Sequence, residues 1–173
     1  MHLSEHITLG EVTKTSVKTA GENIPSHVAI ENLRNICENW LEDLRYSNNV
    51  LYGDRETGRQ GVLGQAKRQS RAQDNTSEAD MPIIITSGYR SPEVNKDVGG
   101  APTSNHLTGC AVDIRCAGIE QALRYANILL DIADGTKRDY DELFIERSKQ
   151  GRYWIHFAVR PKDNRRKTAF IQT

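Results

Sequence analysis

The chain has 173 residues, enough for one domain with a hydrophobic core. Its 23 Lys and Arg balance its 23 Asp and Glu, which argues against a nucleic-acid partner bound through bulk positive charge. No apolar run approaches the ~20 residues of a membrane span, and residues 1–6 lack the basic and apolar regions of a secretory signal. We expect a single domain over residues 1–173, monomeric and cytoplasmic at synthesis.

Two helix signals open the chain. Thr8 followed by Glu11 fits a capping box and predicts a short helix over residues 9–15. Ile24-Pro25-Ser26 predicts the start of a longer helix. Apolar residues recur there at helical spacing, namely Ile30, Leu33, Cys37, Trp40, Leu41 and Leu44. This stripe predicts packing on a sheet and places Trp40 in the core rather than on a substrate.

Residues 47–80 differ in composition from the flanking sequence. Apolar side chains become sparse, and Gly, Gln, Arg, Asp and Ser dominate. The segment is too long and too polar for an ordinary connection, so we interpret it as a surface insertion that is mobile unless something binds it. A lid over a substrate is the alternative.

The stretch from Ile83 to Ile114 organises the rest of the chain. Residues 83–85 are three consecutive isoleucines, which predict a buried strand that delivers Arg90 at its end. Ser91-Pro92 predicts the N-cap and first position of a short helix, which Gly99-Gly100 ends.

A polar loop and a second strand follow. The loop presents His106, and residues 109–114 predict a strand that carries Asp113. Seven residues separate the imidazole and the carboxylate, so the two side chains can converge on one point.

The last third of the chain predicts a helix and a hairpin. Residues 119–132 have amphipathic helical spacing, and residues 143–145 and 153–159 predict two strands joined through Gln150-Gly151. On the second strand Trp154 and His156 share one face, so the indole can wall a pocket around the histidine. The basic segment after Arg160 is expected to lie on the surface.

Three side chains in this scheme are zinc ligands by type: His106, Asp113 and His156. Zinc accepts imidazole nitrogen and carboxylate oxygen, and a site with three protein ligands leaves a position for water. The spacing alone also fits a loop histidine, a capped aspartate and a strand histidine that bind no metal.

The three cysteines are Cys37, Cys110 and Cys116. An odd number without a CxxC pair does not indicate a disulfide framework. We expect buried free thiols, with a thiolate metal ligand as the alternative.

Three motifs together resemble the zinc D-alanyl-D-alanine carboxypeptidase family, which includes the vancomycin-resistance dipeptidases and several phage endolysins. They are Ser87-Gly88-Tyr89-Arg90-Ser91, Ser104-x-His106-x-x-Gly109-x-Ala111-x-Asp113 and Trp154-x-His156. The resemblance covers roughly residues 3–46 and 81–170, and it leaves residues 47–80 outside.

The resemblance implies the α+β fold shared with the Hedgehog signalling domain: a small, mostly antiparallel sheet with helices on one side and a zinc cleft on the other. It implies that His106, Asp113 and His156 bind Zn²⁺. It also implies that Arg90 lies near the scissile group, where a guanidinium holds a substrate carboxylate or stabilises an oxyanion. The implied activity is hydrolysis of a peptide bond next to D-alanine in peptidoglycan stem peptides.

The general base departs from the family pattern. Relatives place a Glu three residues, or a His two residues, before the last zinc histidine, where this chain has Tyr153 and Trp154. Glu146, on the partner strand of the predicted hairpin, is the candidate base. The alternative is a structural carboxylate paired with Arg147 or Arg152.

Two further residues are candidates for substrate binding beside Arg90. Trp154 would wall the pocket, and Ser104 would hydrogen-bond substrate backbone, although a turn role fits Ser104 equally well.

Other function classes stay open. The departures at Tyr153 and Trp154 favour a binding module that keeps the zinc fold without catalysis, whereas Arg90 and the open zinc position favour an enzyme. A phage structural or assembly component is the third hypothesis. An enzyme without a signal sequence would suit a phage lysin that is released to the cell wall, or a cytoplasmic dipeptidase.

Overall fold

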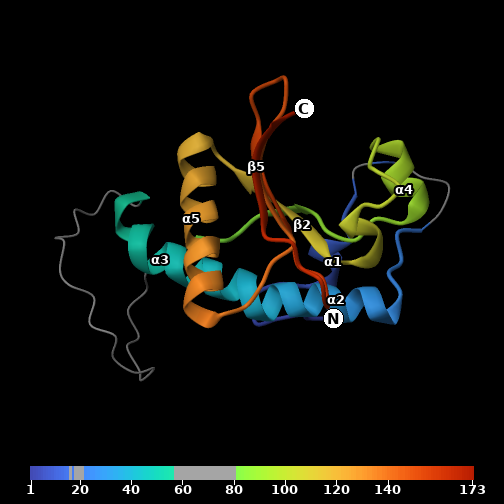
Figure 1. Cartoon of the computed structure of the whole chain (residues 1–173), viewed down its shortest axis with the longest axis horizontal. Coiled ribbons are helices and arrows are strands. Elements are labelled where there is room, and N and C mark those ends of the chain that lie inside the picture. The colour runs from blue at the N-terminus through green and yellow to red at the C-terminus, as the bar shows by residue number, and fades with distance from the viewer. Residues whose placement is uncertain (16, 18–21, 57–80) are drawn as a thin grey trace.

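The computed structural model describes residues 1–15, 17, 22–56 and 81–173 (Figure 1). Its helices are α1 (Leu9–Val12), α2 (His27–Ile36), the π-helical turn η1 (Cys37–Leu41), α3 (Glu42–Glu56), α4 (Pro92–Asp97), the 3₁₀ helix η2 (Asn105–Thr108) and α5 (Ile119–Thr136). Its strands are β1 (Ile85–Ser87), β2 (Ala111–Cys116), β3 (Glu142–Arg147), β4 (Tyr153–Ala158) and β5 (Lys167–Gln172). None of the helices within these described ranges has the length and apolar character needed to cross a membrane.

The predicted α+β class is confirmed. The five strands form one sheet in the order β1-β2-β4-β3-β5, and every neighbouring pair is antiparallel except β3 and β5. Figure 1 shows α5 and α4 on opposite sides of the strands. The sheet therefore separates a helix-covered face from a face that is partly open.

The hydrophobic core lies between the sheet and the helices α2, η1 and α5. Alternate strand residues point into it, namely Val112, Ile114, Leu143, Ile155 and Phe157. Trp40 is 1% exposed, and its ring centroid lies 5.0 Å from that of Phe157. This contact confirms Trp40 as a core residue.

The helix caps follow the sequence signals. Thr8 and Glu11 form the predicted capping box, although α1 ends at Val12 rather than at residue 15. The side chain of Ser26 caps α2, and Ser91 caps α4 with Pro92 at its first position.

The long N-terminal helix continues further than the sequence pattern suggests. It passes through the π-helical turn η1 and runs as α3 to Glu56, ten residues into the predicted insertion. Helix α3 packs on α5: Asn48 is fully buried, and the guanidinium of Arg124 lies 4.5 Å from the ring centroid of Tyr52. The start of the insertion at residue 47 is thus corrected, and residues 57–80 of it lie outside the described residues.

The segment after Arg160 lies on the surface, as predicted, but part of it forms a strand that the sequence did not predict. Residues 167–172 form β5, which pairs in parallel with β3 from Glu142 opposite Lys167 to Arg147 opposite Gln172. Its side chains remain mostly exposed. Backbone hydrogen bonding to the edge of β3 therefore holds this strand, and such pairing leaves no hydrophobic pattern in the sequence.

Candidate metal centre

The two central strands and the η2 loop bring together the three predicted ligands. Asp113 on β2 lies directly opposite His156 on β4. His106 belongs to η2, which ends at Gly109 and leads into β2. Gly109 has φ +70°, and a Cβ there would lie 2.3 Å from the carbonyl oxygen of Ala29. Glycine is therefore required where the loop turns back toward the sheet.

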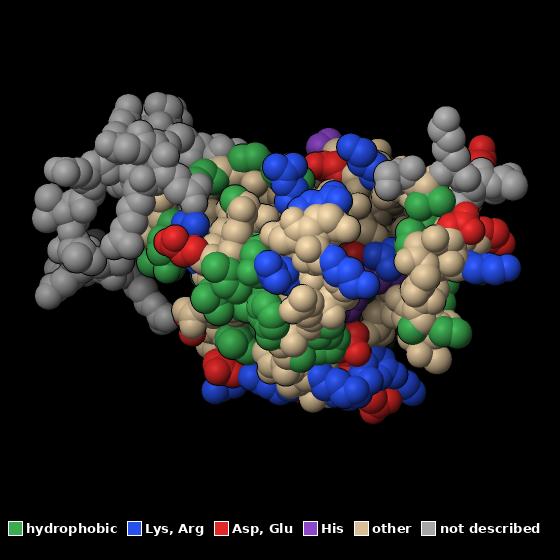
Figure 2. Space-filling model, turned by 90° about the horizontal axis from the view of Figure 1, so that it is seen from above, with side chains coloured by type: hydrophobic (Ala, Val, Ile, Leu, Met, Phe, Trp, Pro, Cys, Tyr) green, Lys and Arg blue, Asp and Glu red, His purple; other side chains and the backbone are tan. Residues whose placement is uncertain are grey.

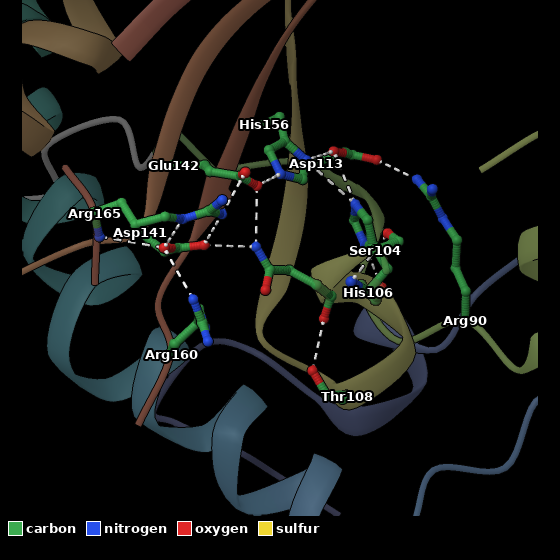
Figure 3. Close-up of polar contacts among 12 residues, drawn as sticks. Arg90, Ser104, His106, Thr108, Asp113, Asp141, Glu142, His156, Arg160 and Arg165 are labelled. Carbon is green, nitrogen blue, oxygen red and sulfur yellow. Dashed lines mark hydrogen bonds and ion pairs between the residues drawn. The ribbon is translucent and has the colours of Figure 1, made fainter. Parts of the chain in front are cut away.

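The three donor atoms lie at distances that suit a tetrahedral metal (Figure 3). His156 Nδ1 is 3.0 Å from Asp113 Oδ1, His106 Nε2 is 3.3 Å from the same oxygen, and the two nitrogens are 3.3 Å apart. Ligands bound at about 2.0–2.1 Å in a tetrahedral zinc site are separated by about 3.3 Å. These residues therefore form a possible metal site, and its donor spacing fits zinc.

The second nitrogen of each imidazole already has a partner. His106 Nδ1 lies 2.6 Å from the carbonyl oxygen of Gly88, which can only accept, so Nδ1 donates there and Nε2 is the nitrogen left to bind a metal. His156 Nε2 lies 3.3 Å from Glu142 Oε2. In metal sites such partners fix the tautomer and the orientation of the ring.

The cluster is electrostatically coupled. Burial alone would lower the pKa of His156, but hydrogen bonds with Asp113 and Glu142 outweigh it and raise that pKa to about 9. Burial alone would raise the pKa of Asp113, but the two histidines hold it well below its usual range. Without metal, Asp113 therefore carries its charge and His156 its proton, and a metal ion must displace that proton.

A second group of polar residues supports His156 from the side away from Asp113 (Figure 3). Glu142 accepts from Arg165 Nη2 at 2.7 Å and from Asn105 Nδ2 at 3.0 Å. Asp141 is fully buried and accepts from Arg165 Nε at 2.7 Å and Nη2 at 2.6 Å, and from Asn105 at 2.9 Å. Burial would raise the pKa of Asp141, but these partners lower it to about 2.

Sequence reasoning missed this group. Asp141 and Glu142 precede the predicted strand without a motif, and Arg165 lies in the segment predicted as a surface tail. The parallel pairing of β5 brings Arg165 to them, and nothing in the sequence pattern shows that pairing.

Arg90 lies against a predicted ligand. Its Nη2 is 2.5 Å from Asp113 Oδ2, and its Nε donates to Ser87 Oγ at 2.8 Å. The guanidinium thus holds the carboxylate oxygen that faces away from the histidines.

All the predicted site residues line one open cavity of about 480 Å³. They are Arg90, Ser104, His106, Asp113, Glu146, Trp154 and His156. The loop after α4 adds Gly99, Gly100 and Ala101 to the wall. Figure 2 shows histidine and acidic side chains at the bottom of a hollow, with Lys and Arg side chains on its rim.

Glu146 is half-buried and lies opposite Trp154 in the β3–β4 register. Burial raises the pKa of its carboxyl group, and the nearby charge of Asp113 adds to the rise. Among the described residues it forms no ion pair, so the structural pairing with Arg147 or Arg152 is not observed.

Ser104 has a local structural role. Its hydroxyl accepts from the backbone N–H of His106 at 3.3 Å and so caps η2, while its side chain also lies on the cavity wall. Both of the alternatives considered for this residue are compatible with that position.

The cysteines lie apart from the metal cluster. All three are free and buried, as predicted. Burial raises the pKa of Cys37 and of Cys116 to about 12. Thiols of this kind are poor metal ligands and poor nucleophiles.

A family model described as Peptidase M15 matches residues 45–137, just over half of the chain. The matched region contains Arg90, His106 and Asp113, and it runs across the polar segment that the motifs leave outside the resemblance. No curated protein matches the chain at a significant level.

Proposed function

The chain belongs to the peptidase M15 family, and from this premise we propose that it is a zinc peptidase that hydrolyses peptide bonds next to D-alanine in peptidoglycan stem peptides. The observation that carries the proposal is the convergence of His106, Asp113 and His156 at tetrahedral spacing on the floor of an open cavity. The family match supports a metallopeptidase. The choice of zinc and of the substrate follows from the donor set and from the resemblance of the motifs.

The three ligands would hold the ion through His106 Nε2, His156 Nδ1 and Asp113 Oδ1. A zinc ion bound there would supply a Lewis acid that polarises the scissile carbonyl and lowers the pKa of water. The partners of the second nitrogens, Gly88 and Glu142, keep both rings turned toward Asp113.

Glu146 is our candidate general base. It lines the same cavity, carries no competing ion pair among the described residues, and has a raised pKa because it is buried. Such a carboxylate takes the proton from the attacking water and passes it to the leaving amine, which typically contributes ~10²–10⁴ in rate.

Arg90 is our candidate for the residue that stabilises the oxyanion or binds a substrate carboxylate. Two of its N–H groups are engaged by Asp113 and Ser87. A guanidinium has five N–H donors in a planar fork, so donors remain for the substrate. Its position against Asp113 also keeps that carboxylate oriented toward the histidines.

The experiment is mass spectrometry of muropeptides after purified peptidoglycan is incubated with zinc-loaded protein. We expect loss of terminal D-alanine or opening of cross-links, and neither reaction with the variant His106→Ala/His156→Ala. Glu146→Gln should retain zinc and lose ~10²–10⁴ in kcat. Zinc binding with unaltered muropeptides would contradict a peptidase and favour a non-catalytic binding module.

A further inference from the structure

A second groove of about 380 Å³ lies beside the metal cavity. It is lined by Thr86, Arg115, Ser148, Arg152, Tyr153 and Trp154. Thr86 and Trp154 also line the metal cavity. The two spaces are therefore neighbours with shared walls, so one ligand can occupy both.

The groove contains two cations without a counter-charge. Arg115 and Arg152 are exposed, and across the described residues neither side chain has an ion pair or hydrogen bond. Most other described arginines have a carboxylate partner, namely Arg34, Arg90, Arg138, Arg160, Arg165 and Arg166. The groove is therefore a local positive region, although the formal net charge of the chain is zero.

The sheet register fixes how far the groove lies from the metal centre. Arg115 lies opposite Trp154, one step along the face from Asp113 and His156. Arg152 follows on the same face. With a rise of about 3.3 Å per residue, these positions lie about 7 and 13 Å along the strands from the ligands. An extended peptide covers this distance with two to four residues.

Arg90 indicates the direction in which a substrate would lie. The backbone N–H of Arg90 donates to the carbonyl of His106, so Arg90 lies on the His106 side of the metal cluster. Arg115 lies on the other side of Asp113. When Arg90 faces the C-terminal part of the substrate, the N-terminal part passes over Trp154 into the groove.

We propose that this groove binds an acidic side chain of the substrate on the N-terminal side of the scissile bond. Tyr153 and Trp154 offer aromatic surface to the aliphatic part of the side chain, and the two guanidiniums bind its carboxylate. The inference rests on the proposed peptidase function and specifies its substrate class.

Two synthetic peptides test the groove. Both end in D-Ala-D-Ala, and the residue two positions before the scissile bond is Glu in one and Gln in the other. We expect kcat/KM of the parent protein to favour the Glu peptide by about 10- to 100-fold, as for a charge-assisted hydrogen bond. In Arg115→Gln/Arg152→Gln the preference should fall to near unity while hydrolysis of the Gln peptide persists. Lys162→Gln removes an exposed charge outside the groove and should keep the preference.

Equilibrium binding of the same peptides to the zinc-loaded protein separates the two proposals. Equal hydrolysis of both peptides by the parent protein would overturn the groove proposal but not the peptidase proposal. A preference for the Glu peptide that survives in Arg115→Gln/Arg152→Gln would have the same meaning. If neither peptide is cut, the peptidase proposal fails. Preferential binding of the Glu peptide that depends on Arg115 and Arg152 would still support the groove, and absence of that preference would overturn it.

Discussion

His156 joins two polar groups through one ring. Its Nδ1 faces Asp113 and His106, and its Nε2 faces Glu142, which Arg165 and Asn105 hold in place. A ligand held in this way loses little orientational freedom when a metal binds. The carboxylate of Glu142 would thus orient His156 in the proposed metal centre without being a ligand.

Glu142→Gln is expected to weaken zinc affinity by about 10- to 100-fold, because the charge that orients His156 is lost. Competition with a chromophoric chelator measures the change. Glu120→Gln, an exposed carboxylate on α5, is the control and should bind zinc as the parent does. An affinity equal to that of the parent in Glu142→Gln would show that Glu142 does not orient the ligand.

The raised pKa of His156 predicts a pH dependence in the metal-free protein. The folded pKa is about 9 against 6.5 for an unperturbed histidine. The stabilisation from protonated His156 is therefore complete below pH 6.5 and is lost as the pH rises through about 9.

Thermal unfolding in a chelator, measured from about pH 6 to 10, should show a fall in Tm over this window. His156→Asn should reduce the fall. Zinc-loaded protein should not show the part of the fall in Tm that is due to His156, because the ion replaces the proton on its ring. A profile shared by the parent and His156→Asn would assign the fall to other groups.

At the scale of the elements, the loop that carries His106 depends on a single glycine. Gly109→Ala places a side chain at φ +70° and 2.3 Å from the oxygen of Ala29. The backbone conformation alone costs about 1–3 kcal/mol, and the overlap with backbone adds to it.

Urea denaturation should therefore show that Gly109→Ala loses at least ~2 kcal/mol. Gly135→Ala is the matched control. A Cβ at Gly135 meets no atom within 4 Å, and the residue lies in α5, so alanine should stabilise by about 0.5–1 kcal/mol. Similar free energies of unfolding for both variants would contradict the requirement for glycine at residue 109.

Local signals in the sequence predicted the elements well, and long-range pairing was not visible. Ser91-Pro92 gave the start of α4, and the alternation along residues 153–159 gave β4 and its two faces. The strand predicted from Ile83 begins at Ile85, and its register with β2 is irregular between Ile85 and Ser87. Strand β5 escaped prediction because its backbone pairs with β3 while its exposed side chains carry no alternation.

The same distinction applies to the site. Histidine and aspartate on neighbouring motifs could be assigned as a cluster because their chemistry is specific. Asp141, Glu142 and Arg165 are ordinary surface types in the sequence, and only the burial of Asp141 and the ion pairs among the three residues distinguish them.

At the scale of the whole molecule, α3 divides the polar segment into two parts. Residues 47–56 belong to a helix that packs on α5, with Asn48 fully buried. Residues 57–80 are predicted from their polar composition alone to contribute little to the core.

Replacing residues 57–80 with a short Gly/Ser linker should therefore keep a single cooperative unfolding transition and change Tm by only a few degrees, roughly 1 kcal/mol. Replacing residues 47–80 removes most of α3 and should cost several kcal/mol, on the scale of large core losses. Differential scanning calorimetry distinguishes the two. Equal stability of the two replacements would show that this part of α3 is not needed for the fold.

The alternation of β4 has a consequence for how this protein can diversify. Ile155 and Phe157 fill the core, whereas Trp154 and His156 face the cavity. The groove residues Arg115 and Arg152 share that outer face. Substitutions on the outer face leave core packing unchanged. The residues that stabilise the fold and the residues that contact the substrate therefore alternate along the same strands. A library randomised at the outer positions should retain folding in most members, which gives evolution or an engineer direct access to new substrate preferences.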